Sequence, residues 1–182
     1  MAEDDKHGGL KGALDKAQDM VGGMVGMASA ATAGSHSTAA FVTNAAMGDL
    51  YEIEAGRIAV RRATSESVRE MGMMMVEHHI TSMHQMKSAL RSNEVTSAHP
   101  DLKPVAELDN RRTGMLQHLI DAPEDDFDKR YLDQQRLAHQ ETLTLLKGYL
   151  ENGDNPQLRS VAMGALPMVE RHLKMFGKMT AH

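Results

Sequence analysis

The stretch that decides the fold is residues 38–90, which read TAAFVTNAAMGDLYEIEAGRIAVRRATSESVREMGMMMVEHHITSMHQMKSAL. Apolar and small residues recur at alternating steps of three and four on both sides of Thr64, as in the core-facing seams of bundled helices. The spacing predicts one helix over about 38–63 and a second over about 65–92. Because the link between them is so short, the two helices must be antiparallel neighbours.

A third helix is predicted over about 104–121, after a loop over 93–103. Pro104 suits its first turn, because proline lacks an amide that would have no helical partner there. At 1.5 Å per residue this helix spans roughly 27 Å, enough to carry the chain back along the bundle. The second and fourth helices would then be parallel. One long crossover of this kind is typical of ferritin-like bundles.

Two further helices complete the predicted bundle. The fourth follows Pro123 with an acidic first turn and runs to about 151. The fifth covers about 156–180, after a turn rich in Asn and Gly, and has a kink near Pro167. We therefore predict an all-α protein, with a ferritin-like four-helix bundle and an additional crossover helix over 36–182.

Residues 1–35 are interpreted as a separate, Gly-rich N-terminal extension. Its apolar residues at 3–4 spacing predict a helix over about 9–31, and they are Leu10, Leu14, Ala17, Val21, Met24 and Ala28. Three glycines weaken this helix, since each costs roughly 1 kcal/mol against Ala. The motif Gly22-x-x-x-Gly26 favours close helix contact, so we expect residues 9–31 to self-associate or to lie on a membrane surface, unless the extension is only loosely ordered.

The composition excludes several classes of function. The 182 residues include 16 Met, 3% aromatic residues and no Cys, so thiolate metal sites and Cys nucleophiles are ruled out. A net charge of -5 without a basic stripe argues against nucleic acid as a partner. No run of 18 apolar residues predicts a transmembrane helix. No signal peptide is recognisable, although Met1-Ala2-Glu3-Asp4-Asp5 would suit a mature terminus after signal removal.

Each of the four long helices places one metal-capable side chain near mid-length on an otherwise apolar or small-residue seam, and these are Glu52, His78, His139 and His172. Burying an unpaired polar group costs a few kcal/mol, so four at similar depth predict one shared polar site. Counting from the turns places Glu52 level with His78, and His139 level with His172 to within about one helical turn. Three imidazoles and one carboxylate make a nitrogen-rich mononuclear site for copper, zinc, nickel or iron.

Two other interpretations of these residues stay open. In one, Glu52 accepts hydrogen bonds from the imidazoles, and the buried network only specifies packing in a structural or interaction module without metal. In the other, the residues face solvent by coincidence. A di-iron centre does not fit, because such centres use Glu-x-x-His on two helices and no Glu here has a His three residues later. An oxidoreductase is therefore the least expected function, and we assign no catalytic residue.

The run of methionines and histidines over 73–86 adds a copper hypothesis. His79 and Met83 lie four residues apart on one helix face, and imidazole with thioether suits Cu(I). Met168 and Met175 repeat this theme on the last helix. These four residues are secondary metal candidates, although methionines at helical spacing usually fill a core.

The same regions of the chain resemble a known family. The motifs that carry the resemblance follow one another along residues 38–180, and they are FVTNAA (41–46), EIEAGRIA (52–59), MVEH (75–78), FDKRYL (127–132), His139 and LPMVERHL (166–173). They look like the successive signatures of the bacterial domain of unknown function 4142. This resemblance implies a ferritin-like fold and a location in the periplasm or cell envelope. Without a recognisable signal peptide, the alternative location is the cytoplasm.

The family's motif positions match Glu52, His78, His139 and His172 in this chain. Glu77 stands where an Asp usually precedes the histidine. The family's biochemical role is not established, so the resemblance adds fold and location. The seam pattern itself favours a metal-binding bundle that serves in storage, buffering or stress protection, and the resemblance places it in the bacterial envelope.

Overall fold

The structure is a computed structural model that describes residues 4–104 and 107–179. These residues contain no strand, which confirms the predicted all-α class. The helices in chain order are α1 (Asp4–Ala31), α2 (Ala33–His36), α3 (Thr38–Arg62), α4 (Glu66–Ala89), α5 (Asn93–Ala98), α6 (Asn110–Ile120), α7 (Glu124–Asn152) and α8 (Pro156–Phe176). None of the described helices has the length and apolar character needed to cross a membrane.

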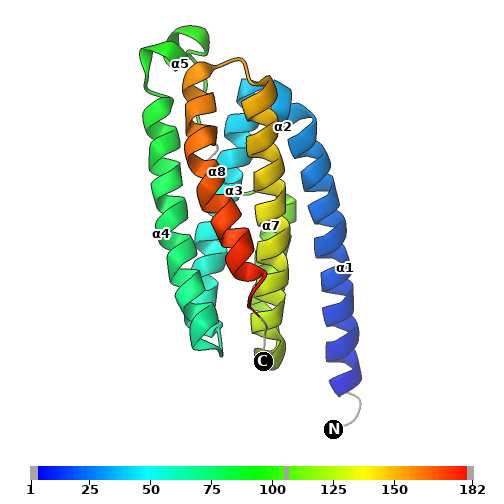
Figure 1. Ribbon diagram of the computed structural model, residues 1–182. Helices are drawn as coiled ribbons and strands as arrows, with labels where there is room; N and C mark the ends of the chain where they lie inside the picture. The colour runs from blue at the N-terminus through cyan, green and yellow to red at the C-terminus, as the bar shows by residue number, and fades with distance from the viewer. Residues whose placement is uncertain (1–3, 105–106, 180–182) are drawn as a thin grey trace.

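The long helices α3, α4, α7 and α8 lie side by side around the core, and α1 lies outside them along α7 (Figure 1). α3 and α8 run in one direction along the bundle, whereas α4 and α7 run in the other (Figure 1). The chain therefore forms two antiparallel hairpins, α3–α4 and α7–α8. As predicted, the helices on either side of the crossover, α4 and α7, are parallel, and residues 90–123 connect them.

Polar side chains start several of these helices. The Ser37 hydroxyl accepts a hydrogen bond from the Ala40 amide at the start of α3. The Asn155 side chain accepts one from the Leu158 amide at the start of α8, where Pro156 occupies the first turn. Each contact satisfies an amide that has no partner within the helix, so the sequence marks these boundaries locally.

α3 and α4 are the most closely packed pair, and two glycines make this possible. A Cβ atom added to Gly56 would lie 2.7 Å from the carbonyl oxygen of Gly72, and one added to Gly72 would lie 2.9 Å from the carbonyl oxygen of Gly56. Any larger residue at either position would push the two backbones apart. This close contact sets the position of α4 relative to α3, and thereby the position of the side chains that α4 turns into the core.

Two hydrophobic clusters fill the core, one toward each end of the bundle. The first contains Ala55, Met75, Leu132 and Phe176 among its buried members. The second contains Phe41, Met86, Leu146, Tyr149 and Val169, and Phe41 stacks on Tyr149 with ring centroids 3.9 Å apart. On α4, for example, His78 and His79 lie between Met75 of the first cluster and Met86 of the second.

The crossover differs from its prediction. The third helix was expected from about 104, with Pro104 in its first turn, but α6 begins at Asn110 and has 11 residues. Asp109 explains this start, because its carboxylate accepts from the Arg112 amide and also pairs with the Arg112 guanidinium at 2.5 Å. At the other end, α5 occupies part of the predicted loop over 93–103. The described part of the crossover therefore contains two short helices, α5 and α6, in place of one long helix.

Two boundaries also differ. α1 already starts at Asp4, five residues before the predicted start, and so extends through most of the predicted N-terminal extension. α8 ends at Phe176, before the predicted end at about 180. Arg136 on α7 donates to the carbonyl oxygen of Phe176, the last helical residue, and to that of Met179, which follows the helix. Pro167 lies inside α8, as expected, and the kink there stays a prediction.

Candidate metal centre

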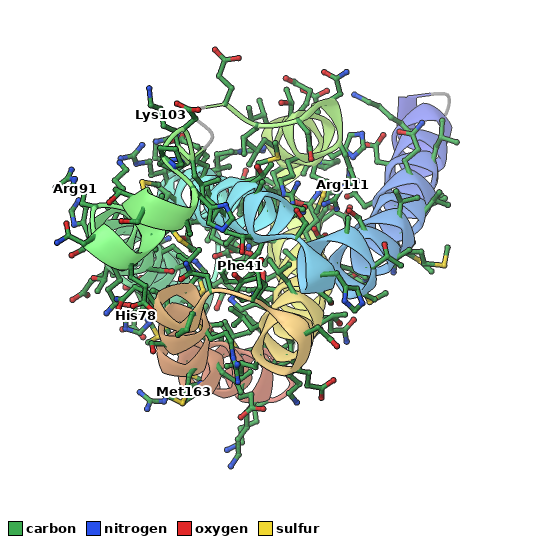
Figure 2. The ribbon with its side chains drawn as sticks, turned by 90° about the horizontal axis from the view of Figure 1, so that it is seen from above. Phe41, His78, Arg91, Lys103, Arg111 and Met163 are labelled. Carbon is green, nitrogen blue, oxygen red and sulfur yellow. The ribbon has the colours of Figure 1, made fainter. Side chains whose placement is uncertain are left out.

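Between the two hydrophobic clusters, polar side chains from all four long helices meet in the core. Four of them are almost completely inaccessible to solvent, with exposed fractions of 1% for Glu52, 2% for His79, 1% for His139 and 0% for His172. His78 is only half-buried and lies between α4 and α8 toward the outside, whereas Phe41 lies near the centre of the bundle (Figure 2). The polar residues thus form one layer across the core.

Three imidazoles in this layer lie close enough to share one ion. One ring nitrogen from each of His79, His139 and His172 lies within 4.8 Å of the corresponding nitrogens of the other two. The ring centroids of these residues are 5.1 to 5.8 Å apart. Metal–imidazole bonds of about 2.0–2.1 Å place ligand nitrogens roughly 3.3–4 Å apart, so side-chain shifts of about 1 Å would close the site around an ion.

His79 is oriented by a carboxylate from α3. Its Nδ1 atom lies 2.9 Å from Oδ1 of Asp49, and both side chains are buried. Donation from Nδ1 to Asp49 leaves Nε2 as the atom that faces the core, and Nε2 is buried without any hydrogen-bond partner. A histidine whose outer nitrogen donates to a carboxylate is the usual arrangement of a metal ligand.

His139 and His172 are oriented in a similar way by other groups. Nδ1 of His139 donates to the main-chain carbonyl of Gln135 at 2.9 Å, which leaves Nε2 as an acceptor 3.0 Å from Nδ1 of His172. Nε2 of His172 lies 2.8 Å from Nδ1 of His78, and the two rings stack. The outer nitrogens of the three rings thus contact Asp49, the Gln135 carbonyl and His78. Of the inner nitrogens, Nε2 of His79 has no partner, whereas Nε2 of His139 and Nδ1 of His172 share one hydrogen bond that a bound ion would have to replace.

Several buried polar atoms around these rings have no hydrogen-bond partner. They include both carboxylate oxygens of Glu52, both amide atoms of Gln135 and Nε2 of His79. Oε1 of Glu52 lies 3.3 Å from Nδ1 of His139, but that N–H donates to the Gln135 carbonyl instead. Native cores contain few such atoms, because each costs about 1–3 kcal/mol. Their concentration at one level indicates that the protein side chains alone do not complete this site.

The pKa directions suit cation binding at neutral pH. Burial, followed by the neighbouring imidazoles, lowers the pKa of His172 to about 2, so this ring is neutral and offers a lone pair. Burial alone would raise the pKa of Glu52, but the neighbouring side chains of His139, His79 and Gln135 together lower it, so this carboxylate is ionised. Metal cations bind imidazole groups that are neutral and carboxylate groups that are ionised.

The Asp49–His79 pair holds a proton that a cation would have to displace. Burial alone would lower the pKa of His79, but the hydrogen bond and the charge of Asp49 raise it. Burial also raises the pKa of Asp49 itself. Binding of a metal at His79 Nε2 would therefore release a proton, and its affinity would fall as the pH is lowered.

The four main candidate residues from the sequence do come to one region, but not around one point. His139 and His172 belong to the close group of three. Glu52 contacts the outer nitrogen of His139, and His78 contacts the outer nitrogen of His172. His79, a secondary candidate, occupies the place on α4 that faces the other two rings.

The methionine candidates are distributed differently. Met168 lines a small cavity beside His79 and Asp49, Met175 packs against the first hydrophobic cluster, and Met83 is partly buried on α4. The buried methionines Met75 and Met86 belong to the two hydrophobic clusters. Methionines near the site therefore fill the core, as methionines at helical spacing usually do.

Two site residues were not predicted as members of the metal site, Asp49 and Gln135: Asp49 beside Glu52 was interpreted as surface charge, and Gln135 only as a residue of the core-facing seam of the fourth helix. Asp49 lies three residues before Glu52, so both carboxylates project from the same face of α3. That spacing could have identified Asp49 as a site residue, because two acidic residues at i and i+3 on a core-facing seam are rarely both buried without partners. Gln135 lies four residues before His139, so its carbonyl oxygen is the normal main-chain neighbour of that ring. The 3–4 spacing from Leu132 through Gln135 to His139 places this Gln on the core-facing seam, but it does not indicate a role in the site.

These features define an all-α protein with a buried cluster of histidines and carboxylates at the middle of its core. The chain belongs to a known family: the model of the domain of unknown function DUF4142 matches residues 23–179. The match begins within α1 and includes every residue of the site. Comparison with curated proteins finds no match, and comparison with solved structures finds none either.

Proposed function

We propose that this protein binds one transition-metal ion through His79, His139 and His172. The observation that carries the proposal is the set of buried polar atoms without partners that surrounds these rings. An ion would use Nε2 of His79, and its positive charge would compensate the ionised Glu52 carboxylate. Asp49, the Gln135 carbonyl and His78 would hold the outer nitrogens of the three ligands.

The donor set narrows the choice of metal. Imidazole nitrogens with a nearby carboxylate suit zinc, Cu(II), nickel and iron, whereas Cu(I) prefers sulfur ligands. The group of three contains nitrogen donors only, and the neighbouring methionines are part of the hydrophobic packing. We therefore rank the four divalent ions above Cu(I), contrary to the emphasis on methionine in the sequence.

The surroundings of the site favour binding without catalysis. The cavity beside Asp49 and His79 has a volume of about 20 Å³, which accommodates a single water molecule and leaves no room for a substrate. A metal held in a closed core, with no substrate beside it, suits storage, buffering or stress protection. We also propose that the four long helices form a ferritin-like bundle and that the protein works in the bacterial envelope, as the family resemblance implies.

One observation favours a second candidate function, a structural module without metal. His139, His172 and His78 already form a continuous hydrogen-bonded chain from the Gln135 carbonyl toward solvent. Such a chain would fix the packing of α4, α7 and α8 without an ion. This candidate leaves the unpartnered atoms of Glu52 and Gln135 unexplained, so it ranks second.

Elemental analysis separates the two candidates. The metal-free protein is incubated with copper, zinc, nickel or iron, freed of unbound ions and analysed for bound metal. We expect close to one ion per chain for at least one metal, and loss of that ion in His139→Ala and His172→Ala. His84→Ala is the matched control, because His84 is exposed on α4. Stoichiometry well below one for all four metals would leave only the structural candidate.

A further inference from the structure

α1 is attached to the bundle by its polar face. Asp15 and Asp19 point inward and are 6% and 5% exposed. Asp15 pairs with Arg130 of α7 at 2.7 Å, and Asp19 accepts from His118 of α6 at 2.7 Å. These charged contacts lie where an amphipathic surface helix would normally bury apolar side chains.

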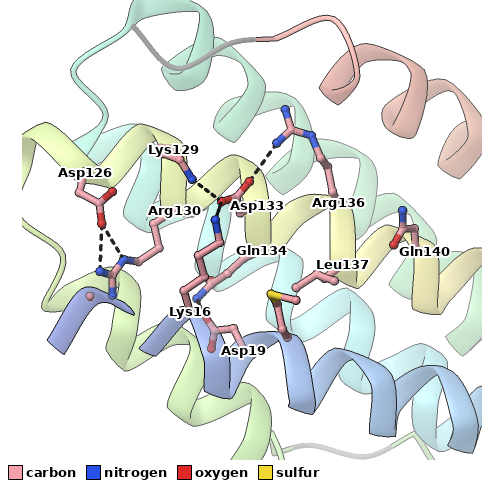
Figure 3. Close-up of a pocket in the computed structure, with 12 residues that line it drawn as sticks. Lys16, Asp19, Asp126, Lys129, Arg130, Asp133, Gln134, Arg136, Leu137 and Gln140 are labelled. Atoms are coloured by element: carbon pink, nitrogen blue, oxygen red, sulfur yellow. Dashed lines mark hydrogen bonds and ion pairs between the residues drawn. The ribbon is translucent and has the colours of Figure 1, made fainter. Parts of the chain in front are cut away.

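Small residues complete this inner face. Gly23 and Gly26 are buried against α7, and a Cβ atom on Gly26 would overlap the carboxylate of Glu141. Farther toward the N-terminus, a groove of about 350 Å³ separates α1 from α7, and charged side chains surround it (Figure 3). At its rim, Asp133 contacts Lys16, Lys129 and Arg136 (Figure 3). A Cβ atom on Gly22 would lie 3.1 Å from the side chain of Arg111 on α6, so both glycines of the Gly22-x-x-x-Gly26 motif serve contact within the chain.

The apolar residues of α1 point away from the bundle instead. Leu14 is 60% exposed, Val21 and Met24 are both 56% exposed, and Val25 is 62% exposed. Ala17 and Ala28 on the same face are also exposed. α1 is the outermost long helix, and within residues 4–104 and 107–179 no other segment covers this face (Figures 1 and 2). Contiguous apolar surfaces of this kind mark interaction sites on folded proteins.

We infer that this face of α1 pairs with the same face of a second copy of the chain, in an antiparallel arrangement. The residues Leu14, Ala17, Val21 and Met24 are separated by steps of three, four and three, so their spacing is the same in both directions along the helix. A twofold axis near residue 19 places Leu14 opposite Met24 of the other copy and Ala17 opposite Val21. Such self-complementary pairing is what a twofold-symmetric interface requires.

Charge and area favour a second copy over a lipid surface. Between Lys11 and Ala31, the two lysines and two aspartates of α1 cancel, and none of them lies on the apolar stripe. Helices that bind anionic membranes carry an excess of Lys and Arg beside their apolar face, and α1 lacks this excess. Two α1 faces in contact would bury on the order of 1,000 Å², about the smallest area of a specific association. The dimer should therefore be reversible.

Sedimentation of the full-length protein over a wide concentration range tests this inference. We expect the wild type to change from monomer to dimer as its concentration rises. Val21→Glu should weaken the dimer at least about tenfold, because it places two unpaired charges at the centre of the contact. Met163→Glu is the control, since Met163 is 63% exposed on α8 and should leave the association unchanged. A monomer at all concentrations would overturn the inference.

Disulfide trapping tests the direction of the pairing, and the chain has no native Cys to interfere. A mixture of the Ala17→Cys and Val21→Cys proteins should form crosslinked dimers more readily than either protein alone. Crosslinking of Val21→Cys mainly with itself would overturn the antiparallel arrangement. Flotation with neutral and anionic phospholipid vesicles provides the last arm: binding to vesicles by a protein that stays monomeric in solution would assign the α1 face to membranes instead.

Discussion

Two buried polar clusters in this protein differ in one respect, which is whether their members satisfy each other. Where α1 meets the bundle, Gln134 donates to Asp19 and to the Met115 carbonyl and accepts from Tyr51, so its amide is fully used. One residue later, Gln135 points into the core, and both of its amide atoms lack partners. The first cluster is complete, whereas the second is incomplete.

The difference shows how buried polarity separates structural from functional roles. Arg130, Asp15 and His118 sit between α1 and the bundle, and each has a charged or hydrogen-bonded partner in the chain. That cluster needs nothing further and holds a helix in place. Around Glu52 and His79, charge and lone pairs remain without protein partners, so a ligand is the simplest way to complete the cluster. Four experiments can break or sharpen this comparison.

The largest effect should follow removal of one member of the complete cluster. Arg130→Ala would leave Asp15 buried without its guanidinium partner, and breaking a buried ion pair costs about 3–5 kcal/mol. Urea unfolding followed by circular dichroism measures the loss. Arg57→Ala is the control, because the exposed Arg57–Glu54 pair should contribute at most about 1 kcal/mol. Equal losses in the two variants would show that the α1 cluster is not a structural unit.

The second experiment follows the stability of the metal-free protein as the pH is lowered. Unfolded chains protonate histidine near pH 6.5, whereas folded His172 stays neutral until about pH 2. The unfolded state therefore binds more protons in this range, and His172 should contribute a loss of about 1.4 kcal/mol per pH unit below 6.5. Denaturant unfolding at several pH values should show a smaller acid loss in His172→Leu. An unchanged acid loss, as expected for the exposed control His84→Leu, would contradict the burial of a neutral ring.

Added metal should stabilise the protein through the incomplete cluster around Glu52 and His79. It should have no effect on the complete cluster between α1 and the bundle. A ligand that binds only the folded state at a hundred times its Kd raises stability by about 2.7 kcal/mol. Thermal unfolding with and without added metal should show this shift in the wild type and in Val21→Glu. His79→Ala should lose it. A shift that persists in His79→Ala would assign the effect to surface histidines such as His84.

The smallest effect comes from the two adjacent glutamines. Gln134→Leu removes three hydrogen bonds from buried partners and should destabilise the protein by about 1–3 kcal/mol. Gln135→Leu removes two amide atoms without hydrogen-bond partners, but it also removes an amide that helps to keep the pKa of Glu52 low, so in the metal-free protein the net change should lie within about 1 kcal/mol of zero. Unfolding of both variants under the same conditions decides the sign. Equal losses would mean that Gln135 is also satisfied.

The sequence predicted the helices well, because their signals are local. Alternating 3–4 spacing located the long helices, and the turns near Thr64 and Gly153 defined the two hairpins. The predicted start of the crossover helix was wrong because Pro104 and Asp109 are both acceptable start signals. The choice between them depends on the pairing of Asp109 with Arg112. Propensity alone does not distinguish two valid caps.

The polar layer was predicted in position but not in detail. Adjacent histidines at 78 and 79 both fit the 3–4 pattern after Met75, so the spacing does not decide which ring faces the core. The packing of α4 against α3, through Gly56 and Gly72, makes that choice in space. The sequence likewise did not show which face of α1 turns toward the bundle, because its polar face is stabilised by Arg130, more than a hundred residues away in the chain. In both cases, distant contacts decide between faces that the local pattern leaves equivalent.

X-ray absorption spectroscopy of the metal-loaded protein tests the central claim most directly, namely that three core histidines and one ion complete the inner cluster. We expect a first shell containing three imidazole nitrogens at about 2.0–2.1 Å, and its loss in His139→Ala. A shell made mainly of water oxygens, or one that His139→Ala leaves unchanged, would contradict the claim and place the metal outside the core.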